Sequence, residues 1–187
     1  VAALGVEFGV APAHHDLAVN QAIIDAIHAG RLDAGIAVVI SNRAHATGLQ
    51  RARDAGLTTR CINHRDFAAR DDFDRALVAE LRAHDVGLVC LAGFMRLVGA
   101  PMLEAFPHAI LNIHPSLLPA FPGVDAQRQA LEHGVKVSGV TVHLVTPELD
   151  AGPIVVQRAV PVLVCALVSA CGAAAPRQGA RRAGGRP

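Results

Sequence analysis

The fold is decided by residues 86–115, which read VGLVCLAGFMRLVGAPMLEAFPHAILNIHP. The stretch opens with an almost wholly apolar run at 86–91, passes through a helical pattern near 100–106 and closes with a second apolar run at 109–113. Short apolar runs of this kind are typical of strands buried on both faces of a parallel sheet. A strand, a helix and a strand in this order predict a right-handed crossover unit and therefore an α/β architecture.

The same alternation extends in both directions along the chain. Upstream, strands are predicted at 35–40 and near 58–62, and downstream two β-rich runs at 137–145 and 154–160 follow each other with no helix between them. Helices are predicted at 21–29, 47–55, 72–84 and 125–133. Gly30 and Gly134 are the expected helix stops, and Asp125 is the expected N-cap of the last helix. Residues 1–162 are therefore expected to form one doubly wound α/β domain with a mostly parallel sheet.

The amino-acid composition excludes several classes of function. The net charge of +1 and the absence of Trp and Tyr argue against a nucleic-acid-binding surface. The four cysteines form no C-x-x-C pair, which favours a reducing compartment over a disulfide framework. No basic leader opens the sequence, and its longest apolar run, at 160–175, falls short of the ~20 residues a membrane helix needs. We expect a cytoplasmic protein with no metal, since the ten histidines form no ligand cluster.

Ligands of doubly wound sheets bind at the carboxyl ends of the strands, which directs attention to the loops at 93–99, 112–123 and 146–153. In the second loop, NIHPSLLP follows a strand, and alternation places Asn112 and His114 on one face. An amide donor beside an imidazole is what acyl transfer needs, because the first can hold an oxyanion and the second a proton. The alternative is a turn whose Asn and His only satisfy backbone groups.

The third loop contains LDAGP, in which Asp150 stands beside glycine and proline. An aspartate in this setting is usually a turn former. If the loop lies beside Asn112 and His114, its carboxylate would raise the imidazole pKa and help to keep the ring charged. His143, in the middle of the strand VTVHLV, is interpreted as an ordinary sheet histidine.

NIHPSLLP and LDAGP together resemble the catalytic motifs of the folate-dependent formyltransferases, and the resemblance covers residues 21–162. Phe121-Pro122-Gly123 before a helix resembles the glycinamide ribonucleotide formyltransferases, whereas the methionyl-tRNA formyltransferases remain an alternative. The resemblance implies that Asn112, His114 and Asp150 are catalytic, and that 10-formyltetrahydrofolate is a consumed cosubstrate whose formyl group goes to the amine of glycinamide ribonucleotide. It also implies a folate-binding set comprising Arg70, Met95, Arg96, Leu97, Val98, Asn112, Thr146, Pro147, Glu148, Leu149 and Asp150.

Both ends depart from that family pattern. The family holds the substrate phosphate on a Gly/Ser/Asn-rich loop, and Leu17, Ala18 and Val19 are expected to stand in its place just before Gln21. Residues 163–187 are rich in Ala, Gly, Arg and Pro, so we expect an unstructured tail in place of a closing C-terminal helix. Such a change of composition is what a GC-rich gene gives when read out of frame. A non-catalytic remnant that retains a folate pocket is therefore the alternative to the enzyme.

Overall fold

The computed structural model describes residues 2–7 and 14–163, with side chains from residue 19 onward. Its centre is a seven-stranded sheet with the order β3-β2-β1-β4-β5-β6-β7. The strands are β1 (Ala2–Glu7), β2 (Gly35–Ser41), β3 (Thr59–Cys61), β4 (Leu88–Ala92), β5 (Ile110–His114), β6 (Val137–Leu144) and β7 (Ile154–Pro161).

Strand direction divides this sheet into two parts. β3, β2, β1, β4 and β5 pair in parallel, while β6 pairs antiparallel with β5 and β7 antiparallel with β6. The expected doubly wound, mostly parallel α/β fold is confirmed, including the parallel direction of β2, β4 and β5. β1, which lies between β2 and β4, was not predicted from the sequence.

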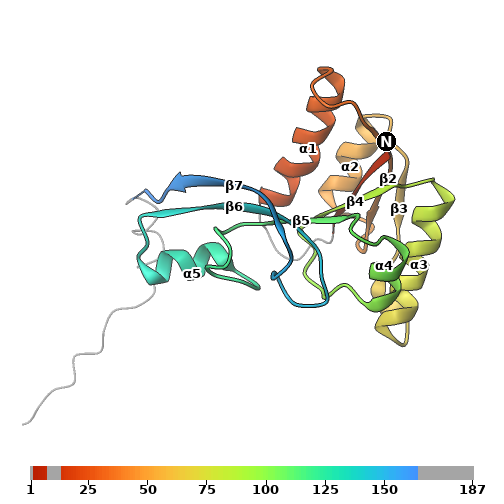
Figure 1. Ribbon diagram of the computed structural model, residues 1–187. Coiled ribbons are helices and arrows are strands. Elements are labelled where there is room, and N and C mark those ends of the chain that lie inside the picture. The colour runs from red at the N-terminus through yellow and green to blue at the C-terminus, as the bar shows by residue number, and fades with distance from the viewer. Residues whose placement is uncertain (1, 8–13, 164–187) are drawn as a thin grey trace, which may run out of the picture.

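The helices are α1 (His14–His28), α2 (Thr47–Asp54), α3 (Arg70–Ala83), α4 (Ala100–Ala105) and α5 (Ala126–His133). In Figure 1, α1 and α2 cover one face of the parallel part and α3 and α4 the other, whereas α5 lies toward the β6–β7 end of the sheet. Alternation along β2 explains the two layers: Val38 and Ile40 pack with Phe73 of α3, whereas Val39 points the other way and packs with Leu49 of α2. The sequence run at 35–40 is apolar throughout because both of its faces are buried.

Two predictions about helix starts were wrong. The first helix begins at His14, not near residue 21, so residues 17–19 lie inside α1 and not in a loop before it. The β1–α1 connection and, apart from Leu163, the expected tail at 163–187 lie outside the described residues. Asp125 does precede α5, but its backbone is left-handed (φ 57°) and its carboxylate pairs with Arg128 at 2.6 Å instead of capping the helix.

Candidate active site

Strand β5 places its two polar side chains on one face of the sheet, as alternation predicted. Asn112 stands opposite His143 of β6, and His114 opposite Thr141. Cross-strand partners share a face, so these four side chains belong to one surface. His114 and His143 are 5% and 3% exposed, which makes this a buried polar cluster that needs internal partners.

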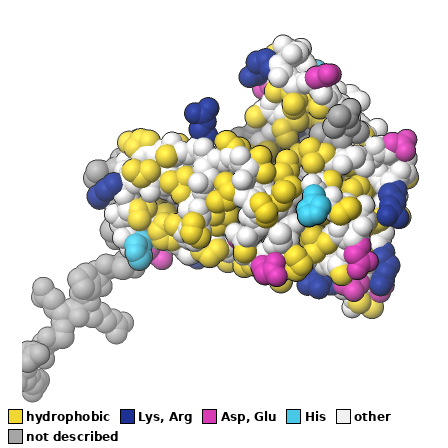
Figure 2. All heavy atoms as spheres, in the orientation of Figure 1, with side chains coloured by type: hydrophobic (Ala, Val, Ile, Leu, Met, Phe, Trp, Pro, Cys, Tyr) yellow, Lys and Arg dark blue, Asp and Glu magenta, His cyan; other side chains and the backbone are white. Residues whose placement is uncertain are grey.

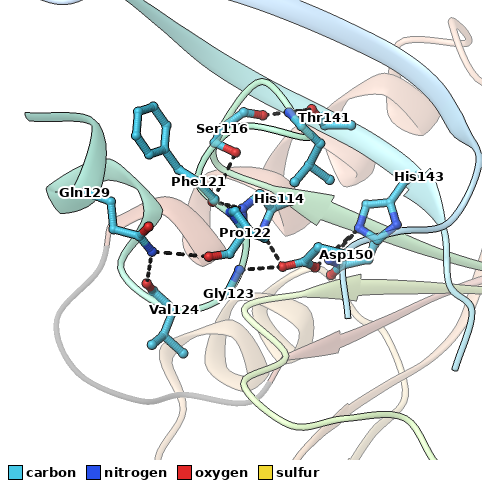
Figure 3. Close-up of polar contacts among 12 residues, drawn as sticks. His114, Ser116, Phe121, Pro122, Gly123, Val124, Gln129, Thr141, His143 and Asp150 are labelled. Atoms are coloured by element: carbon cyan, nitrogen blue, oxygen red, sulfur yellow. Dashed lines mark hydrogen bonds and ion pairs between the residues drawn. The ribbon is translucent and has the colours of Figure 1, made fainter. Parts of the chain in front are cut away.

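Asp150 joins this cluster by a route that strand counting did not predict. Because β6 runs antiparallel to β5, the β6–β7 loop leaves the sheet beside the first residues of β5, with the Val145 N–H donating to the Ile110 carbonyl at 2.9 Å. The loop then folds back, and Asp150 adopts a left-handed conformation (φ 50°). Its carboxylate thereby reaches His114 and His143 (Figure 3). Asp150 and His114 thus come together although the strands that precede them do not end at the same edge of the sheet.

The turn that returns Asp150 to the cluster depends on Gly152. A Cβ at this position would collide with the Leu144 carbonyl oxygen, which faces the backbone of Gly152 directly. The Leu144 N–H also donates to the Pro153 carbonyl at 2.9 Å, which closes the loop behind the glycine. The glycine of the LDAGP motif is therefore required by the backbone approach that positions Asp150.

Both ring nitrogens of His114 have protein partners. Nε2 lies 2.8 Å from the Phe121 carbonyl oxygen and Nδ1 lies 3.4 Å from Asp150 Oδ2. A carbonyl only accepts, so Nε2 carries a proton and Nδ1 is the nitrogen that gains or loses one. The Nδ1 side of the ring faces the carboxylate.

His143 is the site residue that the sequence interpretation undervalued. Its Nδ1 lies 3.0 Å from the Leu144 carbonyl oxygen, and its Nε2 lies 3.1 Å from Asn112 Nδ2 and 3.6 Å from Asp150 Oδ1. Asp150 therefore divides its two oxygens between two imidazoles, while Gly123 N–H donates to Oδ2 at 2.7 Å. Only the fold-back of the β6–β7 loop brings the carboxylate to His143, and no motif around His143 signals it.

The charges of this cluster stabilise one another. The Asp150 carboxylate raises the pKa of His143 above its usual 6.5, against the opposing effect of burial. Burial alone would raise the pKa of Asp150, but the His143 contact, the Gly123 N–H and the two imidazoles together lower it. Asp150 is therefore ionised at neutral pH. A carboxylate must be ionised to stabilise a protonated imidazole beside it.

The loop between β5 and α5 is held rigidly behind His114. Thr141 Oγ1 donates to the Ser116 carbonyl at 2.7 Å and accepts from the Leu118 N–H at 3.0 Å. From α5, Gln129 Nε2 donates to the carbonyls of Pro122 and Val124 at 3.2 and 2.8 Å (Figure 3). These contacts fix the Phe121 carbonyl and the Gly123 N–H, which orient His114 and Asp150.

The proposed folate loop, residues 93–99, is anchored to α3. Asp74 of α3 accepts the Gly99 N–H at 2.7 Å, and the Arg96 guanidinium lies 5.7 Å from the centre of the Phe73 ring. Met95 and Leu97 expose 45% and 47% of their surface, whereas Val98 packs against the core. Two large exposed apolar side chains on an anchored loop are suited to an apolar ring system.

The remaining predicted folate residues lie around this loop and the β6–β7 loop. Arg70 begins α3, and its Nε lies 3.4 Å from where a Cβ on Gly99 would stand, so it borders the 93–99 loop. Thr146 is half-buried and its hydroxyl contacts the Glu148 carbonyl at 3.3 Å. Pro147, Glu148 and Leu149 are exposed. Within the described ranges, no group of three or more His, Cys, Asp or Glu could hold a metal ion.

Comparison with known proteins assigns the class. Residues 15–171 match the formyl transferase family, and the chain belongs to this family. It is 44% identical over 142 residues to the phosphoribosylglycinamide formyltransferase of Escherichia coli, covering 76% of this chain and 67% of that protein. The glycinamide ribonucleotide transformylase 1 structure from Symbiobacterium toebii superposes with a TM-score of 0.81 at 55% identity, covering 87% of this chain and 74% of that one.

A longer relative contains the same unit. The trifunctional purine biosynthetic protein adenosine-3 of Drosophila melanogaster is 49% identical over 145 residues, which are 76% of this chain but 11% of that protein. The chain therefore spans a small part of the trifunctional proteins it matches. None of the helices in the described part of the chain is long and apolar enough to cross a membrane.

Proposed function

We propose that this chain transfers the formyl group of 10-formyltetrahydrofolate to the amine of glycinamide ribonucleotide, in purine biosynthesis. The observation that supports this best is the buried cluster in which Asp150 faces His114 Nδ1 at 3.4 Å, next to the Asn112 carboxamide on the same sheet face. Its relatives in Escherichia coli and Symbiobacterium toebii carry this activity in their names. We further propose that the protein is cytoplasmic.

In the proposed reaction the substrate amine attacks the formyl carbon and forms a tetrahedral intermediate with a negative oxygen. Asn112 donates a hydrogen bond to that oxygen, and protonated His114 supplies the opposing charge. Because Nε2 of His114 is held by the Phe121 carbonyl and Nδ1 faces Asp150, the ring acts on the oxyanion through its charge. The bond from the formyl carbon to N10 then breaks, and the amine proton passes by way of Asp150 to N10, which leaves tetrahydrofolate and a formamide.

Folate recognition is assigned to the two loops around the cluster. The apolar surfaces of Met95 and Leu97, with main-chain groups of 95–98 and 146–150, contact the pterin, while Arg70 suits an anionic part of the cosubstrate. Asp150 contributes to both the chemistry and this pocket.

The identity of the acceptor can be tested with a cosubstrate labelled with ¹³C at the formyl carbon. Glycinamide ribonucleotide and methionyl-tRNA are offered in parallel, and the new formamide carbon is followed by NMR. The proposal requires label in glycinamide ribonucleotide and none in methionyl-tRNA. Label in the tRNA would assign the chain to the other branch of the family, and binding of a folate analogue without transfer to either acceptor would favour the non-catalytic alternative.

A further inference from the structure

The carboxamide of Asn112 has two unlike ends, and its use depends on which end is free. Its nitrogen can donate two hydrogen bonds, and its oxygen can only accept. In this structure Nδ2 faces His143 Nε2 at 3.1 Å. The two ends of a carboxamide exchange places by rotation about one bond, and the hydrogen-bonding partner decides which orientation is preferred. The partner here is a histidine that can be a donor or an acceptor.

The proton of His143 can come and go only at Nε2. Nδ1 is fixed as a donor because it lies 3.0 Å from the Leu144 carbonyl, which can only accept. When His143 is neutral, Nε2 accepts from Asn112 Nδ2, and the oxygen lies at the other end of the carboxamide. When His143 is protonated, Nε2 donates, with Asp150 Oδ1 on one side at 3.6 Å, and Asn112 can face this N–H only with its oxygen, so its nitrogen turns away.

We propose that protonated His143 is a positioning residue that turns the Asn112 carboxamide, releasing its N–H groups toward the formyl oxygen. The inference rests on the proposed formyl transfer for its purpose, but the orientation itself is a property of the protein alone. A carboxamide held with its oxygen at the free end repels a developing oxyanion, whereas one held with its nitrogen there stabilises it. His143 acts on the reaction through Asn112 and does not contact substrate.

The surroundings of His143 favour the protonated form. The ionisable groups that face it are Asp150, with Oδ1 at 3.6 Å, and His114 across that carboxylate; its pair positions Asn112 and Ile154 are uncharged. One buried carboxylate thus contacts both imidazole rings, one through each of its oxygens. The raised pKa of His143 agrees with this arrangement. The orientation seen here, with Asn112 Nδ2 toward Nε2, is the one that a neutral ring accepts, and protonation of His143 reverses it.

The orientation can be measured without turnover. Side-chain amide signals of Asn112, identified by their loss in Asn112→Ala, are followed by ¹H–¹⁵N NMR from pH 5 to 9 beside the ring signals of His143 and His114. The proposal predicts that the Asn112 signals shift with the midpoint of His143, and that this transition disappears in His143→Gln, whose side chain does not titrate. His84→Gln, on α3, serves as the matched control and keeps the transition. If the Asn112 signals do not shift as His143 titrates, the proposal is overturned.

A double-mutant cycle tests the effect on catalysis. The fall of kcat at high pH that comes from deprotonation of His143 should disappear in His143→Gln. His143→Phe should lower kcat by about tenfold to a hundredfold, which is part of the loss caused by removing an oxyanion donor. In an Asn112→Ala background the same His143→Phe change should lower kcat less than about twofold, because the two residues act as a unit. Additive losses with native circular dichroism spectra would overturn the proposal. If the wild-type chain shows no turnover, the proposed function fails, while the NMR titration still decides the orientation.

Discussion

At the scale of single residues, the Asp150 carboxylate connects the two histidines of the site to the loop before α5. It accepts the Gly123 N–H and faces both His114 and His143, with 9% of its side chain exposed. Asp150→Asn keeps the shape and tolerates the left-handed backbone, but it removes the charge. We expect kcat to fall by about 10²–10⁴-fold, the usual contribution of general acid–base catalysis. A fall of less than threefold at pH 7 would contradict the assigned role.

The same substitution has a predictable effect on stability across pH. The lowered pKa of Asp150 gives stability that is present above its ordinary value of 3.8 and lost as pH falls through the lowered value. The raised pKa of His143 gives stability that is complete below 6.5 and lost as pH rises through the raised value. The difference in unfolding free energy between wild type and Asp150→Asn should therefore be largest between about pH 4 and 6.5, at about 1–3 kcal/mol. Urea unfolding at several pH values measures it.

Sequence reasoning placed some of these residues and missed another. Strand alternation was sufficient for Asn112 and His114, because both lie on one short strand whose ends are marked by the sequence. Asp150 was predicted to lie near His114 because both were expected at the carboxyl edge of parallel strands. In the structure it reaches His114 because the loop after the antiparallel strand β6 folds back. His143 was missed because its charge partner is seven residues away and meets it only in the folded loop.

At the scale of elements, the β6–β7 loop should not tolerate a side chain at Gly152. Gly152→Ala would place a methyl group against the Leu144 carbonyl, so we expect a loss of about 1–3 kcal/mol in unfolding free energy from overpacking, together with displacement of Asp150. Gly35→Ala is the matched control, since a Cβ at this strand position meets nothing within 4 Å. Equal unfolding midpoints for the two variants in urea would show that the loop is free to move.

The anchoring of the 93–99 loop to α3 gives a second test. The carboxylate of Asp74 is buried, and burial raises its pKa although the Gly99 N–H opposes that rise. Asp74→Asn should keep the hydrogen bond without a buried charge and remain at least as stable at neutral pH. Asp74→Ala should cost about 1–3 kcal/mol by leaving the Gly99 N–H unpaired and should weaken binding of a folate analogue.

The control for this anchor is Asp72→Ala on the same helix, where the carboxylate is exposed and pairs with Arg75. It should change the unfolding free energy by less than about 1 kcal/mol and leave folate binding intact. Calorimetric titration with the analogue compares the three variants. Tight binding by Asp74→Ala would mean that the 93–99 loop does not form the pocket.

Element identity followed the sequence closely wherever apolar periodicity was strong. α2, α3 and β5 lie within two residues of their predicted bounds, because glycines and buried stripes mark their ends. The start of α1 was predicted seven residues too late, since its first turn carries no helical apolar stripe and the expected family loop was placed over it. The antiparallel direction of β6 was not deduced, because run length and composition do not encode strand direction.

At the scale of the whole molecule, the sheet ends in an apolar edge. Ile154, Val155, Val156 and Val160 of β7 each expose about half of their surface, and hydrophobic side chains gather around β6 and β7 in Figure 2. Exposed apolar edge strands associate with one another. Val156 and Val160 lie on the face of β7 opposite Gln157, whose cross-strand partner is Thr141. The double variant Val156→Lys, Val160→Lys should therefore reduce self-association in sedimentation experiments without lowering turnover. Unchanged association would assign the contact to another surface.

The central claim is that the Asn112–His114–Asp150 cluster transfers a formyl group from 10-formyltetrahydrofolate to glycinamide ribonucleotide. The most direct measurement is kcat with both substrates for the wild-type chain and for Asn112→Ala, His114→Ala and Asp150→Asn, each checked for folding and for thermal protection by a folate analogue. We expect measurable turnover by the wild type and a loss of at least about a hundredfold in each variant, with analogue protection retained in His114→Ala. Wild-type rates in the variants, or a wild-type chain that binds the analogue and transfers nothing, would contradict it.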